Sequence, residues 1–365
     1  MIAAHTRRLS IDWYTFGLIT LLCLLGLAFI LSATYRTELM YSTFFKKQII
    51  GVISGLCIYI ICSLMDVRLL LAWGHLLYAS VIALLIFTIL KGSIGMGAQR
   101  WINLGIIKMQ PSELTKLFFP FFAGYYLYHS QEHPRGLLDF MPILGMLGVS
   151  FILIVKQPDL GTAILISAAG ALSLWLAGLD RRIFLYSIVF GLIGTPLLWN
   201  YLKPYQQQRV RVFLGHGNSN KERYQIEQSK IAIGSGALLG KGYLQGTQNR
   251  LNFLPESRTD FIFSVICEEL GFLGALGVLT LYILLFMRLF YLAAGIKSHL
   301  LYVVAIGLIS PIILGALINI AMVTDLLPIV GIPLPFISYG LSNLWVACAG
   351  LGWFNSIIYT AQSFD

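Results

Sequence analysis

Long apolar segments, separated by shorter polar ones, limit what this chain can fold into more than any other feature. A helix that crosses a lipid bilayer needs about 20 predominantly apolar residues. Segments of about this length recur from one end of the chain to the other, at residues 13–34, 47–65, 69–90, 113–129, 139–155, 160–178, 182–199, 262–287, 300–323 and 334–358. The sequence therefore predicts an all-α polytopic membrane protein with about ten transmembrane helices.

The composition supports this class and excludes others. Hydrophobic residues make up 58% of the chain and charged residues only 11%, whereas a soluble globular protein carries about 25% charged residues. Water-soluble enzymes, disordered chains and fibrous chains are therefore excluded. Nucleic acid is not expected as a partner, although the net charge is +9. We expect a single integral membrane domain that covers residues 1–365.

The charges in the short connections give only a weak indication of orientation. If the N-terminus is cytoplasmic, the short inside and outside segments hold eight Lys and Arg residues each, so the positive-inside rule does not decide. Arg7 and Arg8 favour a cytoplasmic N-terminus. They precede an apolar run without a small-residue cleavage site, which we interpret as a retained first span. Outer segments this basic are typical of a surface that holds something anionic.

Two polar segments interrupt the hydrophobic pattern on the predicted outer face. Residues 91–116 are too polar and too rich in glycine to span a membrane. Residues 200–261 form the one large loop, between the seventh and eighth predicted helices. This loop holds nine Lys and Arg residues against four Asp and Glu residues, a net charge of 9 − 4 = +5. We therefore expect the functional site to lie on this face.

Asp260 stands where the large loop meets the eighth predicted helix. Thr259 is a suitable N-cap residue, which would place Asp260 in the first helical turn, at the positive end of the helix dipole. A carboxylate there stays ionised near neutral pH, as a general base or a cation ligand requires. A favourable helix start accounts for the residue equally well, and its position alone leaves both interpretations open.

Carboxylates at membrane depth are costly and are expected to face the bundle interior with a partner. Glu268 and Glu269 lie along the eighth helix, and Lys116 or Lys156 is a candidate partner. A structural ion pair explains the two carboxylates as well as a functional role does. Glu113 shares a helix face with Lys116 three residues later, which favours a structural pair.

Three further features bear on chemistry. Asp159 precedes the segment 160–178 and is interpreted as the N-cap of that helix. Arg100 and Trp101 have two equally good interpretations. They are suited to contact a phosphate and to stack on a sugar, or they are an interfacial tryptophan beside a snorkelling arginine. The cysteines and histidines are scattered without the spacing of a disulfide framework or metal site. The sequence therefore predicts no metal ligands of these types.

Four segments together resemble the SEDS family of cell-wall polymerases, and more closely its elongation branch than its division branch. They are GAQRWINLGIIKMQPSEL at 97–114, KQPDLGTA at 156–163, the stretch at 228–272 that contains LPESRTDFIF, and GIPLPFISYG at 331–340. Their order and spacing are those of the family, and the resemblance covers nearly the whole chain. It implies a multi-pass protein of the cytoplasmic membrane with ten spans and an active site on the extracytoplasmic face.

The resemblance also implies an activity, an inverting peptidoglycan glycosyltransferase. Such an enzyme joins lipid II to a lipid-linked glycan strand through β-1,4 bonds and releases undecaprenyl pyrophosphate. Asp260 matches the aspartate that the family needs for activity. On this basis Asp260 would take the proton of the acceptor 4-hydroxyl, and Arg100, Arg209 and Arg211 would neutralise the departing pyrophosphate. No cofactor is required by the sequence, which leaves open that Asp260 holds a divalent cation, Mg²⁺ or Mn²⁺.

Other residues acquire supporting roles through the same resemblance. Trp101, Glu113 and Lys116 match positions in family motifs, and Asp159 and Glu268 are expected to support the site. The partners implied are a class B penicillin-binding protein, which is a transpeptidase, and the other elongation proteins of the rod complex. Two alternatives remain at this point, namely a lipid II flippase and a non-catalytic scaffold that activates the transpeptidase.

The chain also departs from the family pattern at three positions. Leu341 and Asn343 stand in SYGLSN, where the family commonly reads SYGGSS, and Asp325 replaces a small or apolar residue. We expect these differences to alter the fit of the last helices around the substrate, or a partner contact.

Overall fold

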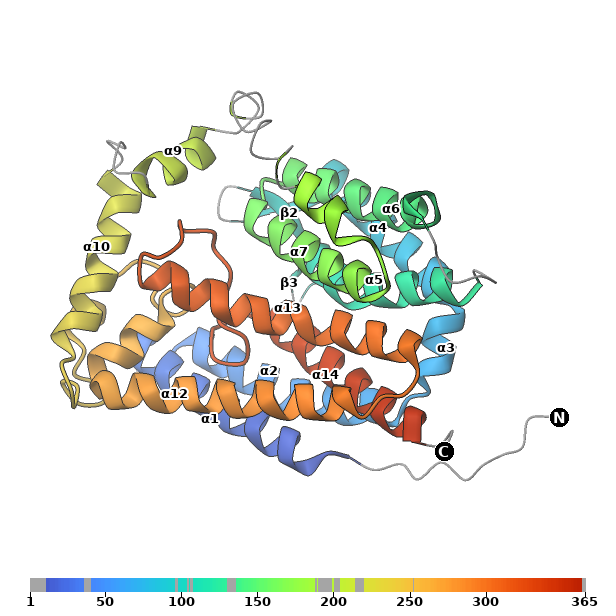
Figure 1. Cartoon of the computed structure of the whole chain (residues 1–365). Coiled ribbons are helices and arrows are strands. Elements are labelled where there is room, and N and C mark those ends of the chain that lie inside the picture. The colour runs from blue at the N-terminus through green and yellow to red at the C-terminus, as the bar shows by residue number, and fades with distance from the viewer. Residues whose placement is uncertain are drawn as a thin grey trace.

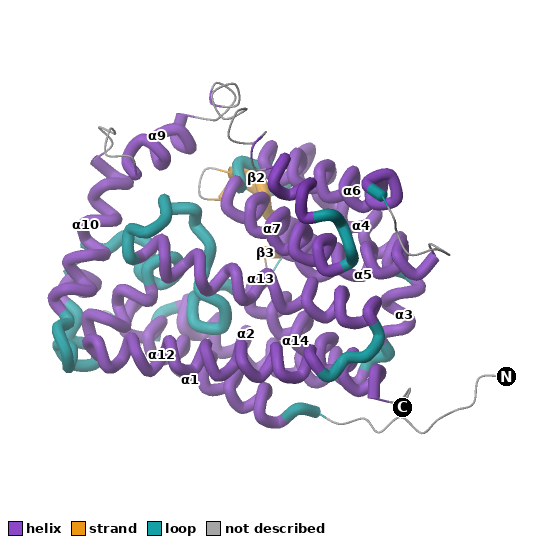
Figure 2. The backbone as a smooth tube through the Cα atoms, viewed as in Figure 1, coloured by secondary structure: helices purple, strands orange, loops and turns teal. Residues whose placement is uncertain are grey.

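The structure is a computed structural model, and its described part is helical apart from one small sheet (Figure 2). It describes residues 11–35, 41–95, 98–103, 105, 108–129, 136–187, 189, 199, 204–213, 220–251 and 253–362. Three antiparallel strands in the order β1–β2–β3 form the sheet, with bounds Ser93–Gly95, Ala98–Asn103 and Lys108–Met109. This sheet occupies the polar, glycine-rich segment that precedes the fourth predicted span.

Most helices follow the apolar segments of the sequence. The helix bounds are α1 Trp13–Thr34, α2 Thr43–Leu64, α3 Val67–Ala72, α4 Gly74–Lys91, α5 Pro111–His129, α6 Leu137–Lys156, α7 Leu160–Leu176, α9 Pro204–Phe213, α10 Asn220–Ser235, α11 Thr247–Arg250, α12 Ile262–Ala294, α13 His299–Val323 and α14 Leu341–Gln362. Of these, α9, α10 and α11 are polar helices of the large loop. Within the described residues, seven helices are long and apolar enough to cross a membrane, namely α1, α2, α4, α6, α12, α13 and α14. The prediction of an all-α membrane protein is thereby confirmed.

Two of the remaining predicted spans form helices that are shorter or less apolar. Helix α7 is an apolar helix of 17 residues. Helix α5 carries Glu113 and Lys116 near its start and is buried along most of residues 111–124. It packs against α4, α7, α13 and α14 in the interior of the bundle, so protein rather than lipid surrounds it. The predicted span 182–199 lies largely outside the described residues.

The structure corrects three of the predicted boundaries. The segment 69–90 is not one helix, because Trp73 separates α3 from α4. The last span begins at Leu341 rather than at residue 334, because Pro333 and Pro335 lie in an irregular segment that precedes α14. Helix α12 continues to Ala294 and bends at Gly271, whose φ of 66° and ψ of −161° are not helical.

The bundle has two hydrophobic cores that share α5 and α13. Figure 1 shows α4, α6 and α7 on one side of α13, and α1 and α12 on the other. The larger core joins buried residues of α1, α2, α12, α13 and α14, and the smaller one joins α4, α5, α6 and α7. Helix α10 packs on α12 at one end of the bundle. The start of α1 and the second half of α14 meet at the other end, where the Asp12 amide donates to Asn355 Oδ1.

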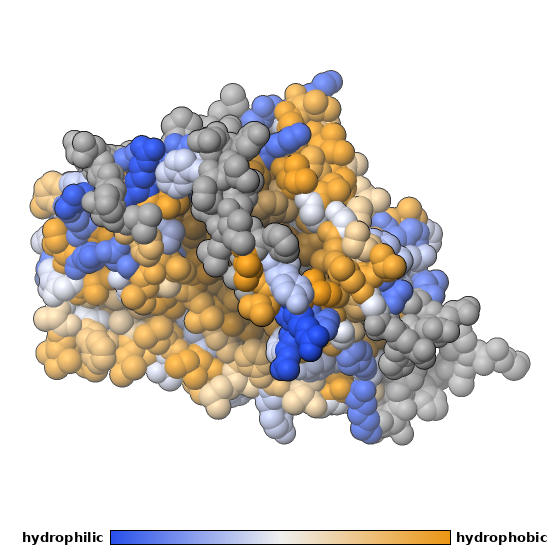
Figure 3. Space-filling view, turned by 45° about the horizontal axis from the view of Figure 1, so that its top comes forward, coloured by the Kyte–Doolittle hydropathy of each residue, from blue (hydrophilic) through white to orange (hydrophobic). Residues whose placement is uncertain are grey.

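The surface agrees with a lipid environment. Large apolar side chains are exposed along the outer faces of the spanning helices, for example Ile50, Leu90 and Ile283. Figure 3 shows such residues over most of the visible face, with hydrophilic residues gathered mainly along its margins. Exposed apolar surface of this extent marks a face that is covered in the working protein, here by the bilayer.

Candidate active site

Asp260 lies in the turn that leads into α12, and not inside the helix. The helix begins at Ile262, and Thr259 does not cap it, because the Thr259 hydroxyl donates to the backbone oxygen of Glu256 at 3.3 Å. The prediction that Asp260 occupies the first helical turn is therefore wrong. The Asn319 amide instead fixes this turn, since it donates to the backbone oxygens of Asp260 at 3.0 Å and Ile332 at 2.8 Å.

The surroundings of Asp260 make its carboxyl more basic than that of an ordinary aspartate. The pKa of Asp260 is raised from 3.8 to about 6, mainly by burial and also by the nearby charges of Glu256 and Asp159, while Arg209 and Arg100 lower it. The side chain remains partly exposed. At neutral pH the carboxyl is therefore mostly ionised, as predicted, although burial and charged neighbours rather than a helix dipole set its pKa.

Gly331 leaves room beside this carboxyl. A Cβ atom at Gly331 would lie 3.6 Å from Asp260 Oδ2, and the φ of this residue is +74°, a conformation that favours glycine. The segment 331–340 therefore approaches Asp260 with backbone only at this point.

Arg100 reaches the site from strand β2 and forms an ion pair with Asp159, with 3.4 Å between Nη1 and Oδ2. Asp159 is the N-cap of α7, as predicted, because its carboxyl accepts from the Thr162 amide at 3.2 Å. Gln110 also donates to Asp159, at 2.6 Å. The charges of Asp159 and Arg100 both act on Asp260, so the sheet segment and the start of α7 lie at this site.

The other predicted cations and the tryptophan are placed differently. Arg209 is in α9 and acts on Asp260, whereas the Arg211 guanidinium lies 5.6 Å from the ring centroid of Trp199. Trp101 is in strand β2, where it pairs with Ser93 and its side chain is partly exposed. Among the predicted phosphate contacts, Arg100 and Arg209 are thus the two whose charges act on Asp260.

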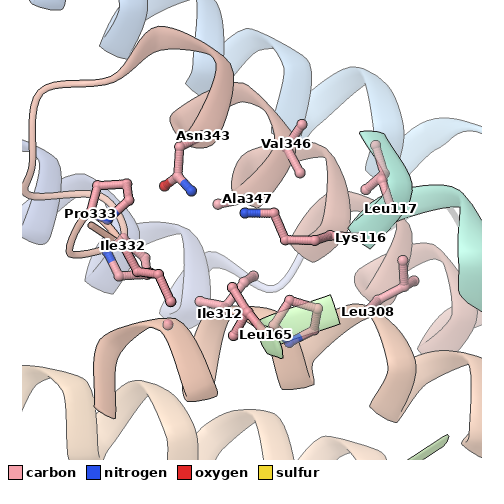
Figure 4. A pocket seen from close by; sticks show the side chains of 13 residues that line it. Lys116, Leu117, Leu165, Leu308, Ile312, Ile332, Pro333, Asn343, Val346 and Ala347 are labelled. Carbon is pink, nitrogen blue, oxygen red and sulfur yellow. The ribbon is translucent and has the colours of Figure 1, made fainter. Parts of the chain in front are cut away.

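Glu113 and Lys116 form the predicted pair, with 2.6 Å between Nζ and Oε2, and both side chains are buried. The Asn343 amide donates to the same carboxylate oxygen at 3.1 Å. Lys116 and Asn343 line a small cavity of about 20 Å³ whose other walls come mainly from apolar residues of α13, α14 and the segment 331–340 (Figure 4). Lys116 is therefore a cation placed in a largely apolar cavity.

Glu268 and Glu269 do not pair with Lys116 or Lys156, so that prediction is wrong. The Glu268 carboxylate binds Lys241 Nζ at 2.6 Å and accepts from the Thr247 and Gln248 amides at 2.8 and 3.0 Å. Glu269 accepts from the Ser32 hydroxyl and from the Leu244 amide. The two carboxylates fasten the end of the large loop to α12, which supports the structural interpretation.

Three residues around Asp260 were not predicted from the sequence. Glu256 and Arg258 stand in LPESRTDFIF beside Asp260, and this adjacency was a signal that pointed to both. Asn319 comes from the last third of α13, where it is a buried amide among mostly apolar residues. Such an amide is expected to have a partner, but the sequence does not identify the partner as the turn at Asp260.

The family model of FtsW/RodA/SpoVE, described as a cell cycle protein, matches residues 12–363. The chain belongs to this family. The resemblance to the SEDS family that the four motifs indicated is therefore confirmed. The match extends over both hydrophobic cores and includes Asp260 and its neighbours.

Curated members of the FtsW/RodA/SpoVE family align over most of the chain. The peptidoglycan glycosyltransferase MrdB of Escherichia coli K12 is 41% identical over 309 residues, which cover 84% of this chain and 83% of that protein. Stage V sporulation protein E of Bacillus subtilis is 32% identical, with 95% of this chain and 96% of that protein covered.

Solved structures confirm the fold. A chain from a structure on the coordination of polymerization and crosslinking by a peptidoglycan synthase complex superposes with a TM-score of 0.81 at 25% identity. It covers 96% of this chain and 98% of its own length. The rod shape determining protein RodA of Thermus thermophilus superposes with a TM-score of 0.71 at 25% identity, covering 97% of this chain and 98% of that chain.

Proposed function

We propose that this protein is a peptidoglycan glycosyltransferase of the RodA type, which polymerises lipid II into β-1,4-linked glycan strands. The observation that carries the proposal is the Asp260 carboxyl, which has a pKa of about 6 and lies near the charges of Arg100 and Arg209. A general base works best when its pKa is near the working pH. Cations beside it suit the stabilisation of a pyrophosphate that leaves with negative charge.

In the proposed reaction the carboxylate of Asp260 takes the proton from the 4-hydroxyl of the acceptor sugar. The freed oxygen forms a bond to C1 of the donor sugar from the face opposite the leaving group. The bond between C1 and the phosphate oxygen breaks, and its electron pair leaves with undecaprenyl pyrophosphate. Arg100, Arg209 and Arg211 would neutralise this charge, and Trp101 would provide a stacking surface for a sugar. The configuration at C1 is inverted.

The supporting residues would hold these groups in place. Asp159 fixes Arg100 through the ion pair, and Gln110 restrains Asp159 in turn. Glu113 compensates the charge of Lys116 in the cavity, while Glu268 fastens the loop that precedes Asp260. We assign these residues to positioning rather than to the chemical step.

The described residues do not favour a divalent cation held by the protein. No group of three His, Cys, Asp or Glu side chains within them is arranged to hold a metal ion. Of the acids near Asp260, Asp159 is engaged by Arg100 and Gln110, and Glu256 accepts from Thr259. The proposed steps are therefore assigned to side chains of this chain, without Mg²⁺ or Mn²⁺.

We further propose ten spans in a single membrane domain, counted as the seven apolar helices, α5, α7 and the segment 182–199, or 7 + 2 + 1. The site is assigned to the extracytoplasmic face of the cytoplasmic membrane, the side of the basic loop 200–261. The expected partners are a class B penicillin-binding protein and other elongation proteins of the rod complex. The similarity to a chain from a peptidoglycan synthase complex supports such a partner.

The decisive experiment is polymerisation of purified lipid II by the detergent-solubilised protein, with wild type compared against Asp260→Asn. Asparagine keeps the shape of the side chain but removes its charge and basicity. We expect polymer from the wild type and none from an Asp260→Asn variant with an unchanged melting temperature. Polymer from both would exclude Asp260 as the base. Polymer from neither, even with the transpeptidase present, would favour the flippase or the scaffold.

A further inference from the structure

Arg258 forms a cluster with two aromatic side chains in the neighbourhood of Asp260. Its guanidinium carbon lies 4.0 Å from the ring centroid of Phe44, within the range of a cation–π contact. Phe44 meets Tyr339 edge to face, with 5.3 Å between ring centroids and an interplanar angle of 87°. Phe44 belongs to the first turn of α2 and is 37% exposed, so the cluster borders solvent.

Hydrogen bonds to backbone oxygens join the three segments that contribute to this cluster. The Tyr339 amide donates to the Arg258 backbone oxygen at 2.9 Å, and the Ser338 hydroxyl donates to the Thr259 oxygen at 2.5 Å. Gln48 of α2 donates to the Ser338 oxygen at 3.4 Å. The position of Arg258 is therefore fixed by the turn before α12, by the segment 331–340 and by α2.

Arg258 differs from three other cations of the chain in having no acidic partner among the described residues. Arg100 pairs with Asp159, Lys116 with Glu113 and Lys241 with Glu268. No ion pair of Arg258 is found within the described part of the chain, and its buried Nε has no hydrogen-bond acceptor there. A guanidinium stacked on a ring keeps its in-plane N–H groups available, and these match two oxygens of a carboxylate or phosphate.

We propose that Arg258, supported by Phe44 and Tyr339, is a separate binding site for a two-oxygen anion of the glycan substrate. This inference rests on the proposed function and adds a second anionic contact to it. The candidate groups are a carboxylate of the peptide stem and a phosphate of a lipid-linked sugar. Asp260 follows two residues later in the chain, so an anchored substrate would be held next to the base.

The site is distinct from the one assigned to the leaving pyrophosphate. Arg100 and Arg209 are the cations that lower the pKa of Asp260. Arg258 instead lowers the pKa of Tyr339, which burial raises. The guanidinium of Arg258 lies against the Phe44 ring, whereas the charges of Arg100 and Arg209 act on the Asp260 carboxyl.

The experiment measures binding without turnover, so it remains decisive if the protein does not polymerise lipid II. Isothermal titration of the purified full chain in detergent would use two soluble probes, inorganic pyrophosphate and a synthetic stem pentapeptide. The variants are Arg258→Gln, Arg258→Lys and the matched control Arg250→Gln. Arg250 is an exposed arginine of the same loop, in α11, and its substitution changes the net charge equally.

We expect Arg258→Gln to weaken binding of one probe at least tenfold and Arg250→Gln to leave it unchanged. Loss for the pentapeptide alone assigns a carboxylate, and loss for pyrophosphate alone assigns a phosphate. Arg258→Lys keeps the positive charge but loses the planar guanidinium, which can donate two parallel hydrogen bonds. This variant should bind the probe several-fold more weakly than the wild type. The proposal is overturned if Arg258→Gln binds both probes as tightly as the wild type does. If the glutamine variant does not fold, the same result for a folded Arg258→Lys variant overturns it.

Discussion

The protonation of Asp260 should control the rate of the proposed reaction in mildly acidic solution. With a pKa of about 6, about nine-tenths of the carboxyls are ionised at pH 7 and about one-tenth at pH 5. Because only the ionised form accepts a proton, kcat/KM should rise about tenfold per pH unit below pH 6 and level off above it. An ordinary aspartate, with its pKa of 3.8, would give a flat profile over this range.

Two substitutions should move this midpoint in opposite directions. Glu256→Gln removes the largest charged contribution that raises the pKa of Asp260, so the midpoint should fall to a value between 3.8 and about 6, since the effect of burial remains. Arg100→Gln removes a charge that lowers the pKa, so the midpoint should rise above 6. Glutamine at position 256 can still accept the hydrogen bond from the Thr259 hydroxyl, so this substitution changes mainly the charge.

The assay is the initial rate of lipid II polymerisation at low substrate concentration, from pH 4.5 to 8.5 at constant ionic strength. Thermal shift across the same range separates loss of activity from unfolding. Glu227→Gln serves as the matched control, because Glu227 is an exposed acid of α10 that pairs with Arg223. A flat wild-type profile between pH 5 and 8, or a midpoint that moves the same way in both variants, would refute the assignment of Asp260 as the base.

Three further predictions concern stability and can be checked by thermal shift. Glu268→Ala leaves the partly exposed Lys241 and two backbone amides without their acceptor, so we expect a loss of about 2–4 kcal/mol, mainly from the two amides. An unchanged melting temperature would contradict this. Gly236→Ala should be strongly destabilising, because its Cβ would lie 1.9 Å from a backbone oxygen of α12, whereas Gly234→Ala, with open space around the new Cβ, should be tolerated. Lys230→Ala breaks a partly exposed ion pair with Asp325 and should change stability by less than about 1 kcal/mol.

Hydropathy predicted the helix boundaries well for helices that face lipid. It predicted them less well for segments that are buried inside the protein. The segment 13–34 coincides with α1 at both ends. The last predicted span began seven residues early, because the buried irregular segment before α14 is as apolar as a helix. Pro333 and Pro335 were the local sign that a helix does not start there, since a proline lacks the backbone N–H that a helix interior needs.

Local spacing identified contacts between near neighbours but not contacts made by the fold. The Asp159 cap and the pair of Glu113 with Lys116 involve residues three positions apart. The pair of Lys241 with Glu268 joins residues 27 positions apart, and the sequence does not show how the loop returns to α12. The helix-dipole argument for Asp260 failed for a related reason, because it assumed a helix start that the turn at 255–261 delays.

Two of the three departures from the family pattern, Leu341 and Asn343, are compensated inside this chain. Leu341 fills the space at Gly51, where a Cβ would lie 2.3 Å from the leucine Cδ2 atom. Asn343 donates to the oxygen of Glu113 that also binds Lys116. A serine at position 343 has a shorter side chain and would leave that oxygen with Lys116 alone unless the backbone moved closer. Because Asn343 restrains the carboxylate, it also restrains the ammonium group that the cavity presents. The substitution therefore acts on a buried ion pair rather than on an exposed surface.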